Sequence, residues 1–121
     1  MTALIVDDTS ILRKVLGGIL QEYCSISKSS ILEANDGVEG LEIYKQKKPN
    51  VVFLDVAMPN MGGKECVKQI LEIDSSAKII MCTAAADEQM VTDCMNAGAK
   101  AYLVKPLRPE LVVAAIKKAG L

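Results

Sequence analysis

The chain has 121 residues, 50% of them hydrophobic, and a formal net charge of −1 at pH 7, which fits one domain with a buried core. This charge balance, together with 3% aromatic residues and no Trp, argues against a nucleic-acid surface of basic patches or stacked rings. No apolar run is long enough to span a bilayer and the N-terminus has no signal-peptide pattern, so we expect no membrane association.

Four cysteines, Cys24, Cys66, Cys82 and Cys94, lie in apolar contexts without Cys-x-x-Cys spacing, and the chain contains no His. This inventory excludes a Cys–His zinc site and a Ser–His or Cys–His nucleophile. We interpret the cysteines as small buried apolar residues in a reducing compartment, and we therefore expect a cytoplasmic protein.

Five strand-like apolar runs alternate with five segments of helical periodicity along the chain. The expected strands cover residues 3–6, 31–34, 51–55, 78–82 and 101–104. The first helix is expected to begin at a Thr9 or Ser10 hydroxyl cap and to end near Tyr23. The second begins at the Asn35-Asp36-Gly37 turn and stops at Pro49-Asn50, the third covers about 63–73, the fourth ends at 96–98, and the fifth begins at Pro109.

Each helix carries apolar residues at helical spacing that we expect to form its buried face. These faces are Ile11, Leu12, Val15, Leu16, Ile19 and Leu20; Val38, Leu41 and Tyr44; Cys66, Val67, Ile70 and Leu71; Met90, Val91, Cys94 and Met95; and Leu111, Val112, Ala115 and Ile116. Strands that alternate with helices imply a parallel sheet with helices on both faces. No linker or repeat divides the chain, so we expect a single α/β domain over residues 1–121.

Polar side chains that can bind ligands or react stand where the expected strands end: Asp7 and Asp8, Asp55, Thr83 and Lys105. Because the carboxyl ends of parallel strands share one edge of the sheet, these side chains should converge there. Three carboxylates without His or Cys favour a hard cation, of which Mg²⁺ is the natural choice. A Lys ammonium and a Thr hydroxyl suit phosphate oxygens, and a carboxylate placed among them can act as a nucleophile toward phosphorus.

These residues, with Met58-Pro59-Asn60-Met61-Gly62-Gly63 after Asp55, Ala84 after Thr83, and Tyr102 before Lys105-Pro106, resemble the receiver domain of bacterial response regulators over essentially the whole chain. Single-domain members of the chemotaxis type are the most similar pattern. The resemblance implies a flavodoxin-like doubly wound sheet of five parallel strands in the order 2-1-3-4-5, with five helices.

The resemblance also implies a metal site and a phosphorylation site. Asp55 matches the phosphoacceptor, which takes a phosphoryl group from a phosphohistidine of a sensor histidine kinase or phosphotransfer protein. Asp8 and Asp55 would bind Mg²⁺ directly, with the backbone carbonyl of Ala57 as a further ligand and Asp7 acting through water.

Further matching positions concern the phosphoryl group and the switch. The resemblance implies that Thr83, the amide of Ala84 and Lys105 hold phosphoryl oxygens, and that the Lys105–Pro106 bond is cis. Tyr102 matches an aromatic residue that turns inward when Thr83 moves toward the phosphate.

Two features depart from the family pattern. Gly62 stands where Asp or Asn is more common, so we expect a looser turn after Asp55. Ala57 and Ala85 flank the expected line of water attack with side chains that neither position nor block a water molecule.

The implied function is that of a phosphoaccepting response regulator of a two-component His–Asp phosphorelay, which catalyses only its own phosphoryl transfer and dephosphorylation. Its fourth helix, fifth strand and fifth helix would form the face that binds a downstream protein, and we expect a monomer that binds neither nucleic acid nor membrane. An alternative is the receiver half of a longer transcriptional or effector regulator, and another is a degenerate receiver used only for docking.

Two enzyme or carrier classes compete with this interpretation. A Mg²⁺-dependent phosphatase with an aspartyl-phosphate intermediate usually has a second Asp two residues after the nucleophile, where this chain has Ala57. A flavodoxin-type FMN carrier needs a Ser/Thr-rich phosphate loop after the first strand and aromatic residues around the flavin, where this chain offers acids and no Trp.

Overall fold

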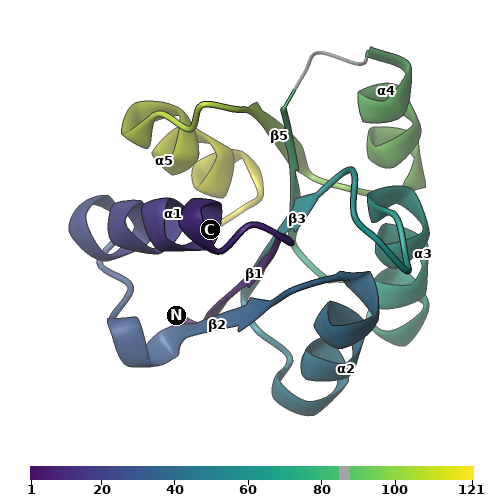
Figure 1. The fold of residues 1–121 in the computed structure, drawn as a ribbon, viewed down its shortest axis with the longest axis horizontal. Helices are drawn as coiled ribbons and strands as arrows, with labels where there is room; N and C mark the ends of the chain where they lie inside the picture. Colours follow the sequence, from purple (N-terminus) through teal and green to yellow (C-terminus); the bar gives the residue numbers. More distant parts are fainter. Residues whose placement is uncertain (85–87) are drawn as a thin grey trace.

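The computed structural model describes residues 1–84 and 88–121 and contains the expected alternation of strands and helices (Figure 1). The five strands are β1 (Ala3–Val6), β2 (Ile31–Ala34), β3 (Val51–Asp55), β4 (Ile79–Thr83) and β5 (Ala101–Val104). The helices are α1 (Ser10–Tyr23), α2 (Gly37–Lys47), α3 (Gly63–Ile73), α4 (Glu88–Ala97) and α5 (Pro109–Lys118), with a short 3₁₀ helix over Lys28–Ser30 before β2.

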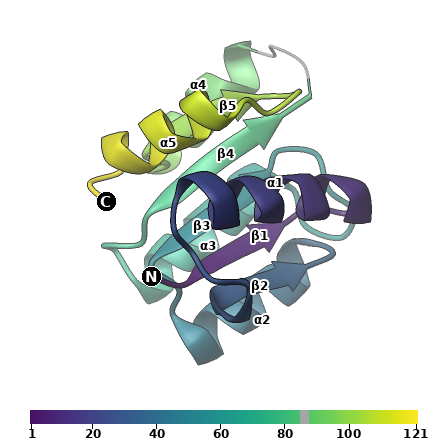
Figure 2. The same cartoon turned by 90° about the vertical axis from the view of Figure 1, so that its left-hand side faces the viewer.

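The strands form one parallel sheet in the order β2-β1-β3-β4-β5, which confirms the expected fold (Figure 2). The register pairs Val6 with Leu54 and Asp55 with Cys82. Asp7, which directly follows Val6, is therefore level with Asp55, and Thr83 lies one residue further along the next strand. This register brings residues from distant parts of the sequence to the carboxyl edge of the sheet.

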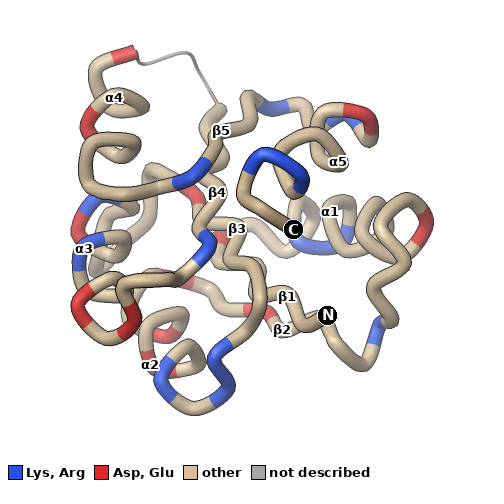
Figure 3. The backbone as a smooth tube through the Cα atoms, turned by 180° about the vertical axis from the view of Figure 1, so that it is seen from behind, with Lys and Arg blue, Asp and Glu red and all other residues tan. Residues whose placement is uncertain are grey.

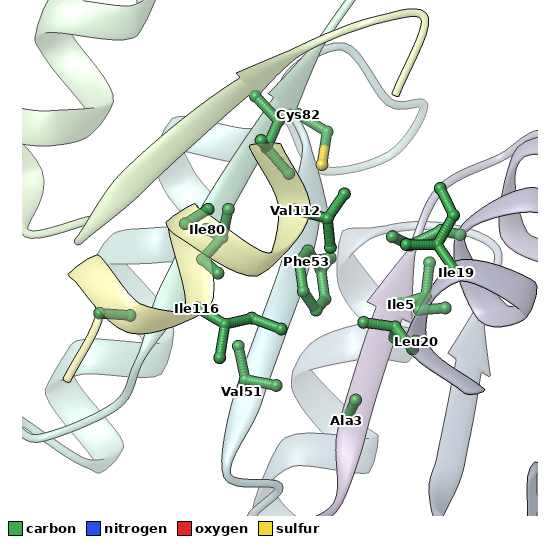
Figure 4. Packing of buried hydrophobic residues seen from close by; sticks show 14 of the residues in the cluster. Ala3, Ile5, Ile19, Leu20, Val51, Phe53, Ile80, Cys82, Val112 and Ile116 are labelled. Atoms are coloured by element: carbon green, nitrogen blue, oxygen red, sulfur yellow. The ribbon is translucent and has the colours of Figure 1, made fainter. Parts of the chain in front are cut away.

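Two hydrophobic clusters lie on opposite faces of the sheet. Helices α1 and α5 cover one face, and α2, α3 and α4 cover the other (Figure 1). In β3, Phe53 belongs to the first cluster and its neighbour Leu54 to the second, as expected for alternating side chains of a strand buried on both faces. Figure 4 shows the ring of Phe53 next to Val112 of α5, with Ile19 and Leu20 of α1 on the same face of the sheet.

Several apolar residues expected on buried helix faces are exposed instead. Ile11 and Val15 of α1 are 71% and 48% exposed, because the sheet covers only the stripe around Leu16, Ile19 and Leu20. Helix α1 meets the sheet along one side only, so the second apolar stripe faces solvent.

Two other helices show the same difference. Val38 is 52% exposed, because Gly37 and Gly40 are the residues that face Met61 and Val6 at the start of α2. Leu111, in the first turn of α5, is 47% exposed, while Val112 of the same turn enters the core.

The start of α1 also differs from expectation. Thr9 is the N-cap residue, but its hydroxyl makes no capping hydrogen bond and contacts Asp8 Oδ1 at 3.4 Å. The backbone N–H of Thr9 instead donates to Asp7 Oδ1 at 2.8 Å. The Asp7 carboxylate, three residues before the first helical residue, therefore fixes the N-cap residue itself and does not replace a hydroxyl cap on the first helical turn. Strand β4 begins at Ile79 rather than at Lys78 and extends to Thr83.

All four cysteines are free thiols; Cys66, Cys82 and Cys94 are buried, and Cys24 is partly buried. In the part of the chain that the structure describes, we find no helix with both the length and the apolar content needed to cross a membrane. Lys and Glu are interspersed along α3, whereas in α2 the acidic Glu39 and Glu42 precede the basic Lys45 and Lys47 (Figure 3).

Candidate functional site

The expected acidic cluster is present at the carboxyl edge of the sheet. Asp7 and Asp8 lie in the loop between β1 and α1, and Asp55 is the last residue of β3. Each can offer one carboxylate oxygen such that all three oxygens lie within 4.8 Å of one another. Asp7 and Asp55 are buried and Asp8 is exposed, so the cluster is a pocket with one side open to solvent.

Lys105 follows β5 and points into this pocket. Its Nζ lies 2.9 Å from Asp7 Oδ2 and 3.6 Å from Asp55 Oδ2. Burial by itself would lower the pKa of Lys105, but the hydrogen bond to Asp7 and the charge of Asp55 outweigh it and raise that pKa. The ammonium group is therefore held in its charged form between two buried carboxylates.

The electrostatics of Asp55 are set by opposing effects. Burial raises the pKa of the Asp55 carboxyl, and the negative charges of Asp7 and Asp8 raise it further. The Lys105 ammonium and the N–H of Ala57, which donates to Asp55 Oδ1 at 3.4 Å, act in the opposite direction. The net shift of the Asp55 pKa is upward. A cation bound in this pocket would lower that pKa and favour the ionised carboxylate.

Thr83 and Ala84 lie beside the pocket on the β4 side. Thr83 is the buried last residue of β4, and its carbonyl accepts a hydrogen bond of 2.8 Å from the N–H of Lys105. Ala84 follows in an exposed bend. Ala57, on the β3 side, is also exposed. Ala85, which we expected beside the line of water attack, lies outside the described residues.

The loop between β3 and α3 carries Ala57 and the Gly62 position. Gly62 is the N-cap residue of α3, and because glycine has no side chain it supplies no capping hydrogen bond. The loop is held instead by the N–H of Gly63, which donates to the Val56 carbonyl at 2.9 Å, and by Asn60 Nδ2, which donates to Asp36 Oδ2 at 2.7 Å. Asn60 has a positive φ of 67°, a conformation that Asn tolerates better than most residues.

Tyr102 lies in β5 and is 48% exposed. It lies between two clefts, one of about 470 Å³ toward α4 and one of about 360 Å³ toward α5. The Lys105–Pro106 peptide bond that follows β5 is cis, as the resemblance implies. Tyr102 lines both clefts, and Lys105, three residues later, contacts Asp7 in the acidic pocket.

Sequence reasoning missed Arg13, which contacts the acidic loop from α1. Its Nη1 donates to the backbone carbonyl of Asp7 at 2.6 Å, and its Nε donates to Glu33 Oε1 at 2.9 Å. The only signal in the sequence is an Arg in the first turns of a helix that directly follows two acids. Such an Arg is common on helix surfaces, so the pattern alone does not distinguish it.

Comparison with known proteins identifies the family to which this arrangement belongs. Residues 3–117 match the response regulator receiver domain. The chain is 41% identical to the chemotaxis protein CheY of Thermotoga maritima over 115 residues, which are 95% of this chain and 93% of that protein. It is 39% identical to CheY of Listeria monocytogenes over 117 residues, which are 97% and 96% of the two chains.

A solved structure supports the same assignment. The structure of the CheX–CheY–BeF₃–Mg²⁺ complex from Borrelia burgdorferi has a chain that is 33% identical and superimposes with a TM-score of 0.88. The alignment covers 100% of this chain and 90% of that one. Sequence and structure agree over nearly the full length, and the chain belongs to the response regulator receiver family, as a receiver domain homologous to the CheY proteins of two-component signalling.

Proposed function

We propose that Asp55 is the phosphoacceptor of a Mg²⁺-dependent molecular switch that receives its phosphoryl group from a histidine kinase or phosphotransfer protein. The observation that carries this proposal is the position of Asp55 at the end of β3, with the carboxylates of Asp7 and Asp8 within 4.8 Å and Lys105 at 3.6 Å. A buried carboxylate surrounded by further acids and one ammonium group suits chemistry on a phosphoryl group.

The donor set of the pocket fits Mg²⁺. Asp8 and Asp55 would bind the ion directly, the carbonyl of Ala57 would be a third protein ligand, and Asp7 would act through water. All of these are oxygen donors, the type that a hard cation prefers. When bound, Mg²⁺ supplies positive charge that offsets the crowded carboxylates and the phosphoryl oxygens.

In the transfer step, a carboxylate oxygen of Asp55 attacks the phosphorus of the donor phosphohistidine. A new O–P bond forms while the P–N bond breaks, and the imidazole leaves with the electron pair of that bond. Lys105, already within 3.6 Å of Asp55, pairs with a phosphoryl oxygen, and the Thr83 hydroxyl and the Ala84 amide donate to the others. The product is an acyl phosphate on Asp55.

Hydrolysis of this acyl phosphate resets the switch. The oxygen of a water molecule attacks the phosphorus, the bond between Asp55 and the phosphorus breaks, and inorganic phosphate leaves. The Ala57 side chain offers no polar atom to orient this water. The chain therefore contributes to its own dephosphorylation through the groups that hold the phosphoryl oxygens.

The output of the switch is a protein-binding face formed by α4, β5 and α5. Tyr102 lies on this face between two clefts, and Lys105 connects the same strand to the pocket. The Borrelia burgdorferi relative was solved as a complex with the protein CheX, which supports a protein partner for this chain as well. We propose a cytoplasmic monomer whose downstream target is a protein rather than a nucleic acid.

Intact-mass measurement of Asp55→Asn tests the phosphoacceptor assignment. Wild-type protein incubated with acetyl phosphate and Mg²⁺ should gain the mass of one phosphoryl group, and Asp55→Asn should gain none, because the amide is a poor nucleophile toward phosphorus. Asp93→Asn is the matched control, since Asp93 lies on α4 outside the acidic cluster, and it should be modified like the wild type. Normal phosphate incorporation by Asp55→Asn would overturn the assignment.

A further inference from the structure

We propose that Arg13 is a positioning residue that fixes the Asp7–Asp8 turn in the geometry needed to bind Mg²⁺. This inference rests on the proposed function, because it concerns the same acidic pocket. Arg13 itself does not belong to the acidic cluster and offers no ligand atom. It would act through the backbone that carries two members of the cluster.

The contacts of Arg13 join three segments of the fold. Its Nη1 donates to the carbonyl of Asp7 at 2.6 Å, and its Nε donates to Glu33 Oε1 at 2.9 Å in β2. The Arg13 side chain is only 13% exposed, although it stands on a surface helix. The guanidinium group is planar and has a fixed fork of donors, so these two bonds together fix its orientation.

We call the hydrogen bond from Arg13 to the Asp7 carbonyl the clamp. Its effect follows from the different exposure of Asp7 and Asp8. Asp7 is fixed by its own side chain, which accepts hydrogen bonds from Thr9 N–H at 2.8 Å and from Lys105 at 2.9 Å. Asp8 is exposed, and the contact recorded for its carboxylate is the Thr9 hydroxyl at 3.4 Å. The direction of the Asp8 side chain therefore depends mainly on its backbone.

The carbonyl that Arg13 holds belongs to the peptide plane between Asp7 and Asp8. Fixing this oxygen fixes the orientation of the plane and thus the direction in which the Asp8 Cα–Cβ bond leaves the chain. Without the clamp, the plane could tilt while the Asp7 side chain kept its bonds to Thr9 and Lys105. The Asp8 carboxylate would then lose its fixed position in the pocket.

Glu33 completes the arrangement electrostatically. A positive charge next to a cation pocket opposes metal binding, and the Glu33 carboxylate at 2.9 Å offsets the charge of Arg13. Arg13 thereby supplies a strong hydrogen bond to the Asp7 carbonyl at little electrostatic cost to a bound cation. Outer groups that orient metal ligands in this way typically contribute about 10- to 100-fold to metal affinity.

The test is calorimetric titration of the full chain with Mg²⁺ alone, combined with thermal unfolding in EDTA. Arg13→Ala should bind Mg²⁺ about ten-fold more weakly than the wild type. Arg13→Lys keeps the charge but loses the fork and should fall between the two. Glu33→Gln keeps the hydrogen bond to Asp7 but removes the compensating charge, so it should also weaken Mg²⁺ binding.

Arg108→Ala is the matched control. Arg108 also forms an Arg–Glu pair, with Glu110 at 2.8 Å, but both side chains are exposed and the pair lies at the start of α5 rather than on α1. The control should bind Mg²⁺ like the wild type. If Arg13→Ala does not fold in EDTA, Arg13→Lys decides the question.

The outcomes separate the two proposals. Weaker Mg²⁺ binding by the Arg13 variants, at unchanged affinity in Arg108→Ala, supports the clamp. Wild-type affinity in both Arg13 variants, or a change of melting temperature in EDTA without a change of affinity, would show that Arg13 is merely structural. A wild-type chain that binds no Mg²⁺ would overturn the proposed function and this inference with it.

Discussion

Asp8 is the exposed member of a cluster whose other two carboxylates are buried. Its negative charge adds to the repulsion among the three acids and raises the pKa of Asp55. Lys105 pairs with Asp7 and Asp55, so its positive charge offsets the negative charge of Asp8 least directly. In the absence of a metal ion, the Asp8 carboxylate is therefore a source of repulsion without a close ionic partner among the contacts described.

We predict that Asp8→Ala is at least as stable as the wild type in EDTA but loses most of its response to Mg²⁺. For the wild type, Mg²⁺ at ten times its dissociation constant should stabilise the fold by about 1.4 kcal/mol, since the ion binds only the folded state. Chemical denaturation with and without Mg²⁺ measures both effects. A variant that is less stable in EDTA yet keeps the full Mg²⁺ response would contradict this placement of the site.

At the scale of single residues, the sequence predicted the acidic pocket well because its members follow recognisable strands. Asp7, Asp55 and Lys105 each stand where an apolar run ends, and parallel strands bring such ends together. The clamp from Arg13 was not predictable in the same way. Its partner atom is a backbone carbonyl, and every residue has one, so no residue type in the sequence marks the contact.

Helices α2 and α3 pack close to the carboxyl edge of the sheet because glycines stand at their contact points. Gly63, the first residue of α3, lies against the backbone that follows β3: a Cβ added there would be 2.8 Å from the Asp55 carbonyl oxygen and 2.9 Å from Val56 Cα. Both atoms belong to the backbone and cannot turn away. Gly18 in α1 differs, because an added Cβ would meet no atom within 4 Å.

We therefore predict opposite effects of one substitution at the two positions. Gly63→Ala should destabilise the fold by about 1–3 kcal/mol, because the added methyl group must displace backbone next to Asp55. Gly18→Ala should stabilise it by about 1 kcal/mol, because Ala favours the helix and the site has room. Denaturant midpoints of the two variants decide, and equal effects at both positions would refute the packing argument.

At the scale of elements, the sequence predicted which segments are helices better than which sides of them are buried. In α1, Ile11 and Val15 have the spacing of a buried stripe, yet both are exposed. Periodicity shows that apolar residues share a stripe, but the width of helix covered depends on how the sheet and α5 meet it. That geometry arises only when distant segments pack, so it was not available from local patterns.

The whole molecule links the pocket to a distant face through β5. Lys105 contacts Asp7 in the pocket, and its N–H donates to the carbonyl of Thr83 at 2.8 Å, so the ends of β4 and β5 are tied together. Tyr102, three residues earlier, is 48% exposed between two clefts. A phosphoryl group that attracts Thr83 and Lys105 would therefore act on the strand that carries Tyr102.

We predict that phosphorylation shifts an existing equilibrium of Tyr102 toward a form with its ring buried toward the cleft next to α4. Adding beryllofluoride and Mg²⁺ should mimic the phosphoryl group and change the amide chemical shifts of α4 and β5 as well as those of the pocket. Asp55→Asn, which lacks the acceptor, provides the control and should leave α4 and β5 unchanged.

The competing possibility is that Tyr102 packs alike in both states and that the signal leaves through α1, which follows the acidic loop and exposes Ile11 and Val15. In that case the chemical-shift changes would be confined to the pocket and α1, while residues 88–104 stayed silent. That result would reject the output face without affecting Asp55 as phosphoacceptor, because the two claims rest on different residues. Tyr102→Ala separates them further: it should keep phosphate incorporation at Asp55 while the shifts in α4 become smaller, since the pocket groups remain and only the ring that fills the cleft is lost.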